Sequence, residues 1–483
     1  MRRWIFVIAE SGVKMISKKN CLLLFYGAEY FSYYAIMTTL VLFFTRGLHM
    51  GDNESSNLVG NYSSLLYLMP IFGGIFADRF KASLRSLFFG GLILAVGFIL
   101  YSAVEGEISL YFAMTVVILG FGLFRTNIYG VVRKYAEVKS LDGVYVQLYY
   151  IGNLGSFVGI IVAGYFNQYG FHTIFISAAI IFLLAWLIFA LTFRESLKKE
   201  FTKEKNTIFF LLVCAITFGI FYYILYRDYV SILMLVLFIC GLLLFARLYA
   251  KRDKKDTLRL NIYLVLVVFA LTFWIVDFQI YNGLELFIDK MVNRNIGSFV
   301  VPTQWVNAVN AIAIVIVGFF LSRYFSKGDQ AALPVRSLYK FLLGLVIITL
   351  AYVLLTFFVY RGVVDSEHVS VFHMIYVMAM IGVAELFIDP IAIANAQNIS
   401  KNQNTLTGLY MVFSGSIASY LAGQVSIMLN PASSTKAPLH NYLVGLTKID
   451  IALGVSILLL FVIACVFAFK LYSKKNSDTY QFA

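Results

Sequence analysis

Long apolar runs alternate with short polar stretches along almost the whole chain. A helix needs about 20 consecutive apolar residues to cross the hydrocarbon core of a bilayer. The runs therefore predict fourteen membrane-spanning helices, near residues 21–45, 57–77, 86–104, 109–131, 143–168, 171–193, 207–226, 229–249, 260–288, 303–326, 338–360, 369–392, 404–428 and 450–472. This pattern indicates an all-α, polytopic membrane protein.

Composition supports this fold class and changes how the charge is interpreted. Of the 483 residues, 61% are hydrophobic and only 13% are charged, so we expect no soluble domain. A net charge of +13 could suggest a nucleic-acid partner. However, Lys and Arg gather in every second connection, as they do on the cytoplasmic side of membrane proteins. We therefore expect a lipid bilayer as partner, no nucleic acid, and both termini in the cytoplasm.

A weak internal repeat suggests two halves. "GIFADR", which contains Gly74, Asp78 and Arg79, follows the second predicted helix, and "GFFLSR" ends the corresponding helix of the second half. Both lead into a basic connection, and their spacing resembles the signature loop of the major facilitator superfamily. That resemblance implies two six-helix bundles that bind substrate between them. We predict an N-terminal cytoplasmic segment (1–20), a first bundle (21–193), a linker with two extra helices (194–259), a second bundle (260–472) and a cytoplasmic tail (473–483).

Ionisable residues inside predicted spans are rare, and such residues are usually functional. They are Glu29, Arg125, Asp277, Glu285, Asp289, Glu385 and Asp389. Arg125 cannot usefully lose its proton, so it needs a buried acid or an anionic substrate group. Glu29, in the same half, is the expected partner. The pair could simply join two helices, but a buried ion pair often adds little net stability, which favours a functional role.

Polar side chains in both halves predict one binding cavity. In the first half, Tyr33 follows Glu29 by one helical turn and shares its face. The predicted cavity residues are Tyr33, Tyr34, Tyr67, Arg125 and Asn153 in the first half, and Asn310 and Glu385 in the second. A guanidinium in one half and a carboxylate in the other would suit a zwitterion, because arginine can bind a carboxylate through two parallel hydrogen bonds.

Several motifs in the expected order resemble the proton-dependent oligopeptide transporters, in particular their bacterial members with fourteen helices. They include "YLMPIFGGIFADRF", "GLFRTN", "YYIGNLGS" and "AELFIDP", the last resembling the pattern G-E-L-F-x-S-P. The resemblance implies these roles: Tyr33, Tyr34 and Tyr67 line the pocket, Arg125 (a lysine in the family) and Asn153 hold the peptide carboxylate, Asn310 binds the backbone, Glu385 binds the amino terminus, and Tyr410 replaces a pocket tryptophan.

The first and seventh helices depart from the family pattern. The motif E-x-x-E-R-F-x-Y-Y-G is replaced by "YGAEYFSYYA", so Tyr26 and Tyr30 stand where the family has an acid and a base. A second base falls on Met37, and the helix-7 acid falls on Phe278. The losses balance in charge. Glu29 resembles the surviving acid of a proton-coupling motif, and neighbouring Asp277 could substitute for the helix-7 acid, although adjacent helical positions point about 100° apart.

The resemblance implies a monomeric secondary transporter in a bacterial inner membrane. It would move di- and tripeptides by alternating access, with protons driving transport through an atypical set of acids. Alternatives are an uncoupled facilitator or exporter of another small amphiphile, and a receptor that binds without translocating. The sequence shows no phosphate-binding glycine loop, paired metal ligands or nucleophile motif, so we expect no enzyme activity, cofactor or metal.

Overall fold

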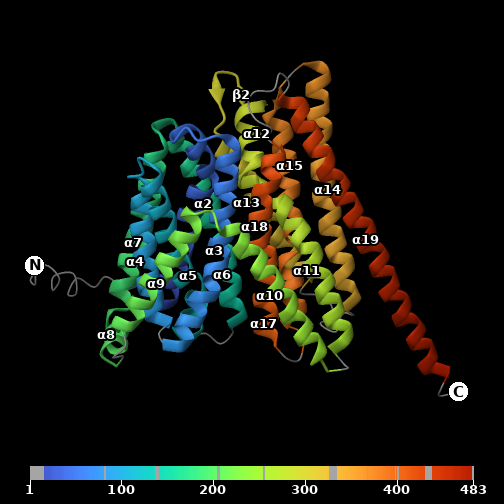
Figure 1. Ribbon diagram of the computed structural model, residues 1–483, viewed down its shortest axis with the longest axis horizontal. Coiled ribbons are helices and arrows are strands. Elements are labelled where there is room, and N and C mark those ends of the chain that lie inside the picture. Colours follow the sequence, from blue (N-terminus) through green and yellow to red (C-terminus); the bar gives the residue numbers. More distant parts are fainter. Residues whose placement is uncertain are drawn as a thin grey trace, which may run out of the picture.

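The computed structural model describes residues 16–80, 83–135, 141–203, 207–253, 256–325, 334–366, 368–397, 399, 402–429 and 438–480. Nearly all of them are helical, and the long helices run alongside one another as a bundle (Figure 1). The first half consists of α2 (Lys18–Leu42), α3 (Asp52–Phe80), α4 (Ser83–Tyr101), α5 (Glu107–Tyr135), α6 (Leu141–Phe166) and α7 (Phe171–Thr192). A short helix, α8 (Arg194–Lys203), and a hairpin of α9 (Thr207–Tyr226) and α10 (Val230–Ala250) follow.

The second half contains several interrupted helices. Its helices are α11 (Thr257–Asp277), α12 (Gly283–Met291), α13 (Thr303–Phe325), α14 (Pro334–Asp365), α15 (Val371–Glu385), α16 (Asp389–Gln397), α17 (Gln403–Met411), α18 (Ala418–Leu429) and α19 (Pro438–Tyr480). Single turns of 3₁₀ or π helix occur at η1 (Phe43–Gly47), η2 (Asn167–Tyr169), η4 (Phe278–Tyr281) and η5 (Val412–Ile417). Two-residue strands pair β1 (Val292–Asn293) in parallel with β4 (Val369–Ser370), and β2 (Asn295–Ile296) antiparallel to β3 (Phe299–Val300).

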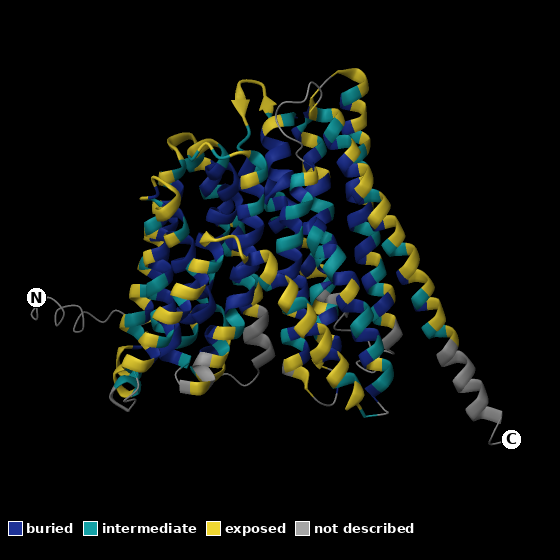
Figure 2. Cartoon of the chain, viewed as in Figure 1, coloured by how far each residue is buried: buried dark blue, intermediate teal, exposed yellow. Residues whose placement is uncertain are grey.

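The predicted polytopic helical fold is confirmed. In the described part of the chain, thirteen helical segments are long and apolar enough to cross a membrane. α2 is not among them because Glu29 and the tyrosines lower its hydropathy, yet it runs through the bundle packed on α6 and α7. Buried residues fill the middle of the bundle, and exposed ones lie on its outer helices (Figure 2). Many exposed side chains are apolar, such as Ile208 on α9, which suits a surface that faces lipid.

Several predicted boundaries were wrong. The helix expected over 450–472 begins at Pro438, and the one expected over 338–360 spans Pro334–Asp365. The prediction followed the apolar runs, whereas both helices continue into polar residues beyond those runs. The run interpreted as a solvated linker contains α8, whose residues are mostly charged. Residues 1–15 of the predicted N-terminal segment lie outside the described part of the chain.

Glycines allow α2 and α6 to approach closely. A Cβ atom added to Gly159 would lie 2.2 Å from the carbonyl oxygen of Phe31, and one added to Gly155 would lie 2.3 Å from that of Gly27. No residue larger than glycine fits at such distances, so the two backbones pack directly on each other. This contact holds α2, which carries Glu29 and the tyrosines, at a fixed place in the bundle.

Contacts between the two halves gather at the end where η1 leads into α3, which is uppermost in Figure 1 and is called the upper end below. Lys290 Nζ lies 2.5 Å from Asp52 Oδ1, and Arg46 forms an ion pair with Asp289. Further down, α3 and α18 touch so closely that a Cβ on Gly60 would lie 2.8 Å from the Cα of Gly423. The halves are thus joined through charge pairs and direct backbone packing at the upper end.

Candidate substrate-binding site

Arg125 forms the polar centre of the first half. α5 presents it to α2, where its Nε donates a hydrogen bond of 3.1 Å to Glu29 Oε1 and lies 3.0 Å from Oε2. Its Nη1 donates to the Tyr30 hydroxyl at 2.8 Å, and its guanidinium carbon lies 4.0 Å from the centre of the Tyr30 ring. The Glu29 side chain is fully buried, whereas 18% of the Arg125 side chain remains exposed. The expected contact between Glu29 and Arg125 is therefore present, and the arginine keeps an open surface.

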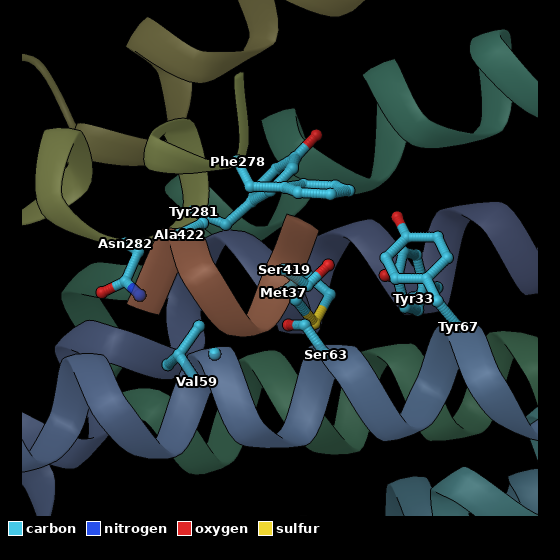
Figure 3. A pocket seen from close by; sticks show the side chains of 11 residues that line it. Tyr33, Met37, Val59, Ser63, Tyr67, Phe278, Tyr281, Asn282, Ser419 and Ala422 are labelled. Atoms are coloured by element: carbon cyan, nitrogen blue, oxygen red, sulfur yellow. The ribbon is translucent and has the colours of Figure 1, made fainter. Parts of the chain in front are cut away.

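A narrow pocket lies between the halves beside this pair. Figure 3 shows Tyr33 and Tyr67 at one end of it and Asn282 at the other. Phe278 and Tyr281 of the second half also line it, with the Tyr67 ring 5.4 Å from the Phe278 ring. The space holds about one water molecule, too little for a peptide. Two predicted pocket tyrosines are thus at the junction of the halves, in a part that is closed in this conformation.

Tyr34 extends this aromatic boundary. Its ring lies 5.0 Å from the Tyr33 ring and 6.1 Å from that of Tyr281 in the second half. It also lies within electrostatic range of Glu385. Tyr34 therefore stands between the basic group of the first half and the acidic group of the second.

The polar centre of the second half surrounds the break between α15 and α16. Glu385 is the last residue of α15 and is partly exposed, and Asp389 begins α16. Gly382 packs one turn before Glu385, where an added Cβ would lie 2.6 Å from the backbone oxygen of Asn310. The side chain of Asn310 is 6% exposed, and its Nδ2 has no hydrogen-bond partner among the described residues. Its amide is thus an unused donor on the helix that packs against α15.

Two aromatic residues hold Asp389. Its Oδ1 accepts a hydrogen bond from the Tyr410 hydroxyl and another, of 3.2 Å, from Trp274 Nε1. The Trp274 ring in turn packs 5.2 Å from Phe278, which stands where the family pattern has an acid. α11, α16 and α17 therefore meet through one hydrogen-bonded group.

The comparisons with known proteins identify the family. A sequence model of the POT family matches residues 84–442. The chain belongs to the POT family. It is 25% identical to "Uncharacterized transporter YclF" of Bacillus subtilis (strain 168), over 89% of this chain and 91% of that protein. It is 26% identical to "Peptide transporter YePEPT" of Yersinia enterocolitica, over 82% of this chain and 85% of that protein. A crystal structure of tetrameric PepTSo2 has the same fold, with a TM-score of 0.80 and 23% identity over 95% of this chain and all of that one.

As a member of the POT family, this chain is a membrane transporter.

Three predicted site residues lie apart from the two polar centres. Asn153 donates its side-chain amide to the backbone oxygen of Tyr149 in its own helix, at 2.9 Å, so the structure gives no contact with Arg125. Gly74 packs against α5, where an added Cβ would lie 2.9 Å from Thr126 Cγ2. Arg79 is exposed near the end of α3, and the side chain of Asp78 lies outside the described part.

Sequence reasoning missed two residues of the hydrogen-bonded group in the second half. Asp389 was noted only as an embedded acid, and Trp274 was not singled out. A signal for Asp389 was present, because "AELFIDP" places it where the family pattern has serine. The hydrogen bond between Trp274 and Asp389 joins residues 115 positions apart, and no spacing rule finds such a pair.

Proposed function

We propose that the protein is a secondary transporter that moves di- and tripeptides across a bacterial inner membrane by alternating access. One observation carries this proposal. A partly open guanidinium in the first half and a partly open carboxylate in the second stand on either side of a boundary of tyrosines. A short peptide has a carboxylate at one end and an ammonium at the other, so it complements both groups at once. The peptide-transporting relative YePEPT supports this choice of substrate.

Each group has a distinct role in this proposal. Arg125 binds the peptide carboxylate once its ion pair with Glu29 is weakened. Glu385 binds the amino terminus, and Asn310 donates its free amide to the peptide backbone. The constant polar ends of the peptide are thereby fixed, while Tyr33, Tyr34, Tyr67 and Tyr410 provide apolar faces with single polar tips, which suit variable side chains.

The closed upper end supports alternating access. The ion pair of Lys290 with Asp52 is partly exposed, and the half-exposed Arg46 side chain pairs with the buried Asp289, so both pairs have a solvated partner and can break and re-form. The opposite end carries partly exposed residues of α6 such as Asn153 and Tyr149, and it serves as the open side in this conformation. With the N-terminus in the cytoplasm, the upper end faces outward, and the structure corresponds to a state that is open to the cell interior.

Protons drive transport in this proposal through Glu29, with Asp277 as the second candidate. The losses in the first and seventh helices remove the usual coupling groups of the family. Glu29 nevertheless remains hydrogen-bonded to the proposed substrate-binding arginine. A proton on Glu29 weakens that ion pair and frees Arg125 for the peptide carboxylate. Proton binding and peptide binding are thereby linked.

Uptake of a labelled dipeptide into proteoliposomes, with and without an imposed proton gradient, tests the function. Accumulation only with the gradient supports symport. Equilibration that ignores the gradient indicates an uncoupled facilitator, and saturable binding without uptake indicates a receptor. Absence of both binding and uptake for a panel of di- and tripeptides contradicts peptide transport. Light scattering of the purified protein tests the expected monomer.

A further inference from the structure

Three carboxyl groups meet on the second half of the molecule. Asp277 ends α11, Glu385 ends α15, and Asp389 begins α16. The Trp274 indole, three residues before Asp277 on α11, donates to Asp389, which follows Glu385 by four positions, so the three acids lie in one region. Among the described residues, none of the three forms an ion pair with a basic side chain. The first half is different, because there Glu29 is matched by Arg125.

Among the described residues, only one of these acids accepts a side-chain hydrogen bond. Asp389 accepts from Trp274 and Tyr410. The Asp277 side chain comes from another helix, is only 2% exposed, and has an oxygen, Oδ1, without any partner in the described structure. A buried, unsatisfied carboxyl oxygen is costly unless a ligand or proton completes it. This orphan acceptor points to a positively charged or donor-rich occupant.

Two of the three acids, Glu385 and Asp389, are partly exposed, whereas Asp277 is buried. Tyr149 on α6 of the first half is within electrostatic range of both Glu385 and Asp389, and Tyr281 is within range of Glu385 and Asp277. Tyr281 also lines the pocket between the halves. An occupant of this space can therefore reach Glu385 and Asp389 directly, whereas the buried Asp277 acts on it through its charge.

The charge count exceeds what a zwitterion needs. A dipeptide with neutral side chains brings one carboxylate, for Arg125, and one ammonium, for Glu385. Asp277 and Asp389 remain unmatched, and Asp389 stands where the family pattern has serine. The indole of Trp274 lies directly beside this extra acid, and a cation that packs against an indole face gains further stabilisation.

We propose that Asp389, together with Asp277 and Trp274, forms a second cation subsite that makes this protein selective for peptides with a basic side chain. This inference rests on the proposed peptide transport and specifies its substrate class. Glu385 binds the amino terminus of the peptide, and the ammonium of a lysine side chain binds Asp389, the first residue of α16. A neutral side chain of the same length leaves the extra acids without a partner.

The test measures binding of a peptide series to the purified protein by titration calorimetry. Lys-Ala and Ala-Lys are compared with Gln-Ala, Ala-Gln and Ala-Glu. Since a hydrogen bond to a charged group contributes about 1.5–3 kcal/mol, the better lysine peptide should bind about tenfold or more tightly than its glutamine counterpart. Ala-Glu should bind most weakly. This comparison uses the unmodified protein and therefore does not depend on how any variant folds.

Asp389→Asn then assigns the selectivity to this position. The asparagine keeps an oxygen that accepts from Tyr410 and Trp274 but removes the charge. We expect the advantage of the lysine peptide over its glutamine counterpart to fall to about twofold or less. Asp389→Ser, the residue of the family pattern, should behave in the same way. The matched control is Asp365→Asn, which removes the charge of an exposed acid paired with Arg361.

The outcomes separate the two proposals. If Gln-Ala binds and the lysine peptides bind no more tightly, peptide binding stands and the cation subsite is wrong. The subsite is equally wrong if Asp389→Asn keeps the full lysine preference while it abolishes gradient-driven uptake, because the cluster then carries protons. If no peptide binds to the folded protein, the proposed function and the subsite both fail.

Discussion

At the scale of single residues, Arg125 illustrates how one side chain joins structure and binding. Its Nε donates to Glu29 and its Nη1 to Tyr30, and its guanidinium packs against aromatic rings of α2 and α5. Lysine, the residue of the family pattern, has one compact charge and no planar fork. This chain therefore combines two differences from the family pattern. Position 125 is arginine instead of lysine, and position 30 is a tyrosine, instead of arginine, that accepts a hydrogen bond from Arg125.

We expect Arg125→Lys to retain part of the uptake activity and Arg125→Ala to lose it. Lysine keeps the positive charge, but one ammonium cannot serve both Glu29 and Tyr30 in the same way. Alanine leaves Glu29 buried without a partner, which costs about 3–5 kcal/mol. Proteoliposome uptake and a melting curve measure both effects. Arg361→Ala, at an exposed arginine, is the control, and full uptake by Arg125→Ala would show that Arg125 has no essential role.

Glu385→Gln should weaken binding of peptides that have a free amino terminus. Replacement of a charge-assisted hydrogen bond by a neutral one is expected to cost about 1–3 kcal/mol, so affinity should fall about tenfold or more. Calorimetric titration measures the change. An amino-blocked peptide, which lacks the ammonium, should be much less sensitive to the substitution. Equal losses for both peptides would assign Glu385 a structural role instead.

Most members of the site were predictable as residue types, while their partners were not. A charged residue in an apolar run is conspicuous, and this signal found Glu29, Arg125, Asp277 and Glu385. A hydrogen bond such as that between Trp274 and Asp389 depends on how α11 and α16 pack, which apolar periodicity does not encode. Asn153 was predicted to bind the peptide carboxylate, but its side-chain amide donates to a backbone oxygen of its own helix, which its residue type alone does not reveal.

At the scale of elements, the breaks in the second half are the main feature that hydropathy did not reveal. α11 is separated from α12 by η4, and α15 from α16 by a turn, although both stretches read as continuous apolar runs. Irregular backbone at membrane depth is tolerated where it is buried in protein or lines a cavity. Glu385 and Asp389 flank one of these breaks, so two partly exposed carboxyl groups lie at a point where the helix is interrupted.

Gly159→Ala should destabilise the protein through the contact between α2 and α6. The added methyl group would lie 2.2 Å from the Phe31 oxygen, so the two backbones must separate. Overpacking of this kind costs about 1–3 kcal/mol. Gly219→Ala is the matched control, because it is also a helical glycine and has no atom within 4 Å of the added group. Thermal unfolding in detergent should show a lower midpoint only for the first variant, and equal midpoints would contradict this account of the packing.

The hairpin of α9 and α10 contacts both halves. α9 packs on α5 and α3, whereas α10 packs on η5, where a Cβ on Gly241 would lie 2.6 Å from the Phe413 ring (Figure 1). Its turn is joined to α3 because Asn61 Nδ2 donates to Asp228 Oδ1 at 2.7 Å. A linker between two bundles therefore also forms a contact between them, which the pattern of charge runs around it did not indicate.

At the scale of the whole molecule, Gly60 and Gly423 determine how tightly the upper end closes. We expect Gly60→Ala to shift the population toward conformations in which this end is open, because the new methyl group would lie 2.8 Å from the Gly423 Cα. In a background without native cysteines, a Ser63→Cys probe in the pocket reports opening through its rate of labelling by a maleimide. Labelling should become faster in the Gly60 variant.

The control for this prediction is Gly51→Ala, which lies directly before α3 and has no atom within 4 Å of the added group. Its labelling rate should match that of the parent protein. If Gly60→Ala labels no faster than this control, the close approach of α3 to α18 does not limit opening of the upper end.

Proton coupling involves the whole molecule, because it requires that one site bias the arrangement of both halves. In the proposed mechanism, ionised Glu29 holds Arg125, and a proton on Glu29 releases the guanidinium to the peptide carboxylate. Glu29→Gln permanently resembles the protonated form. This variant should bind peptide and exchange it across the membrane, yet fail to accumulate it when a proton gradient is imposed, as measured by counterflow and gradient-driven uptake in the same proteoliposomes.

Asp277→Asn must be measured beside it, because Asp277 is the rival acid and its buried Oδ1 has no partner among the described residues. Normal accumulation by the Glu29 variant together with loss in the Asp277 variant would place coupling in the second half. If the parent protein itself ignores the gradient and neither substitution alters transport, the protein is a facilitator. Glu29 then serves only as the structural partner of Arg125, and the balanced loss of acids and bases in the first and seventh helices marks the loss of coupling rather than its relocation.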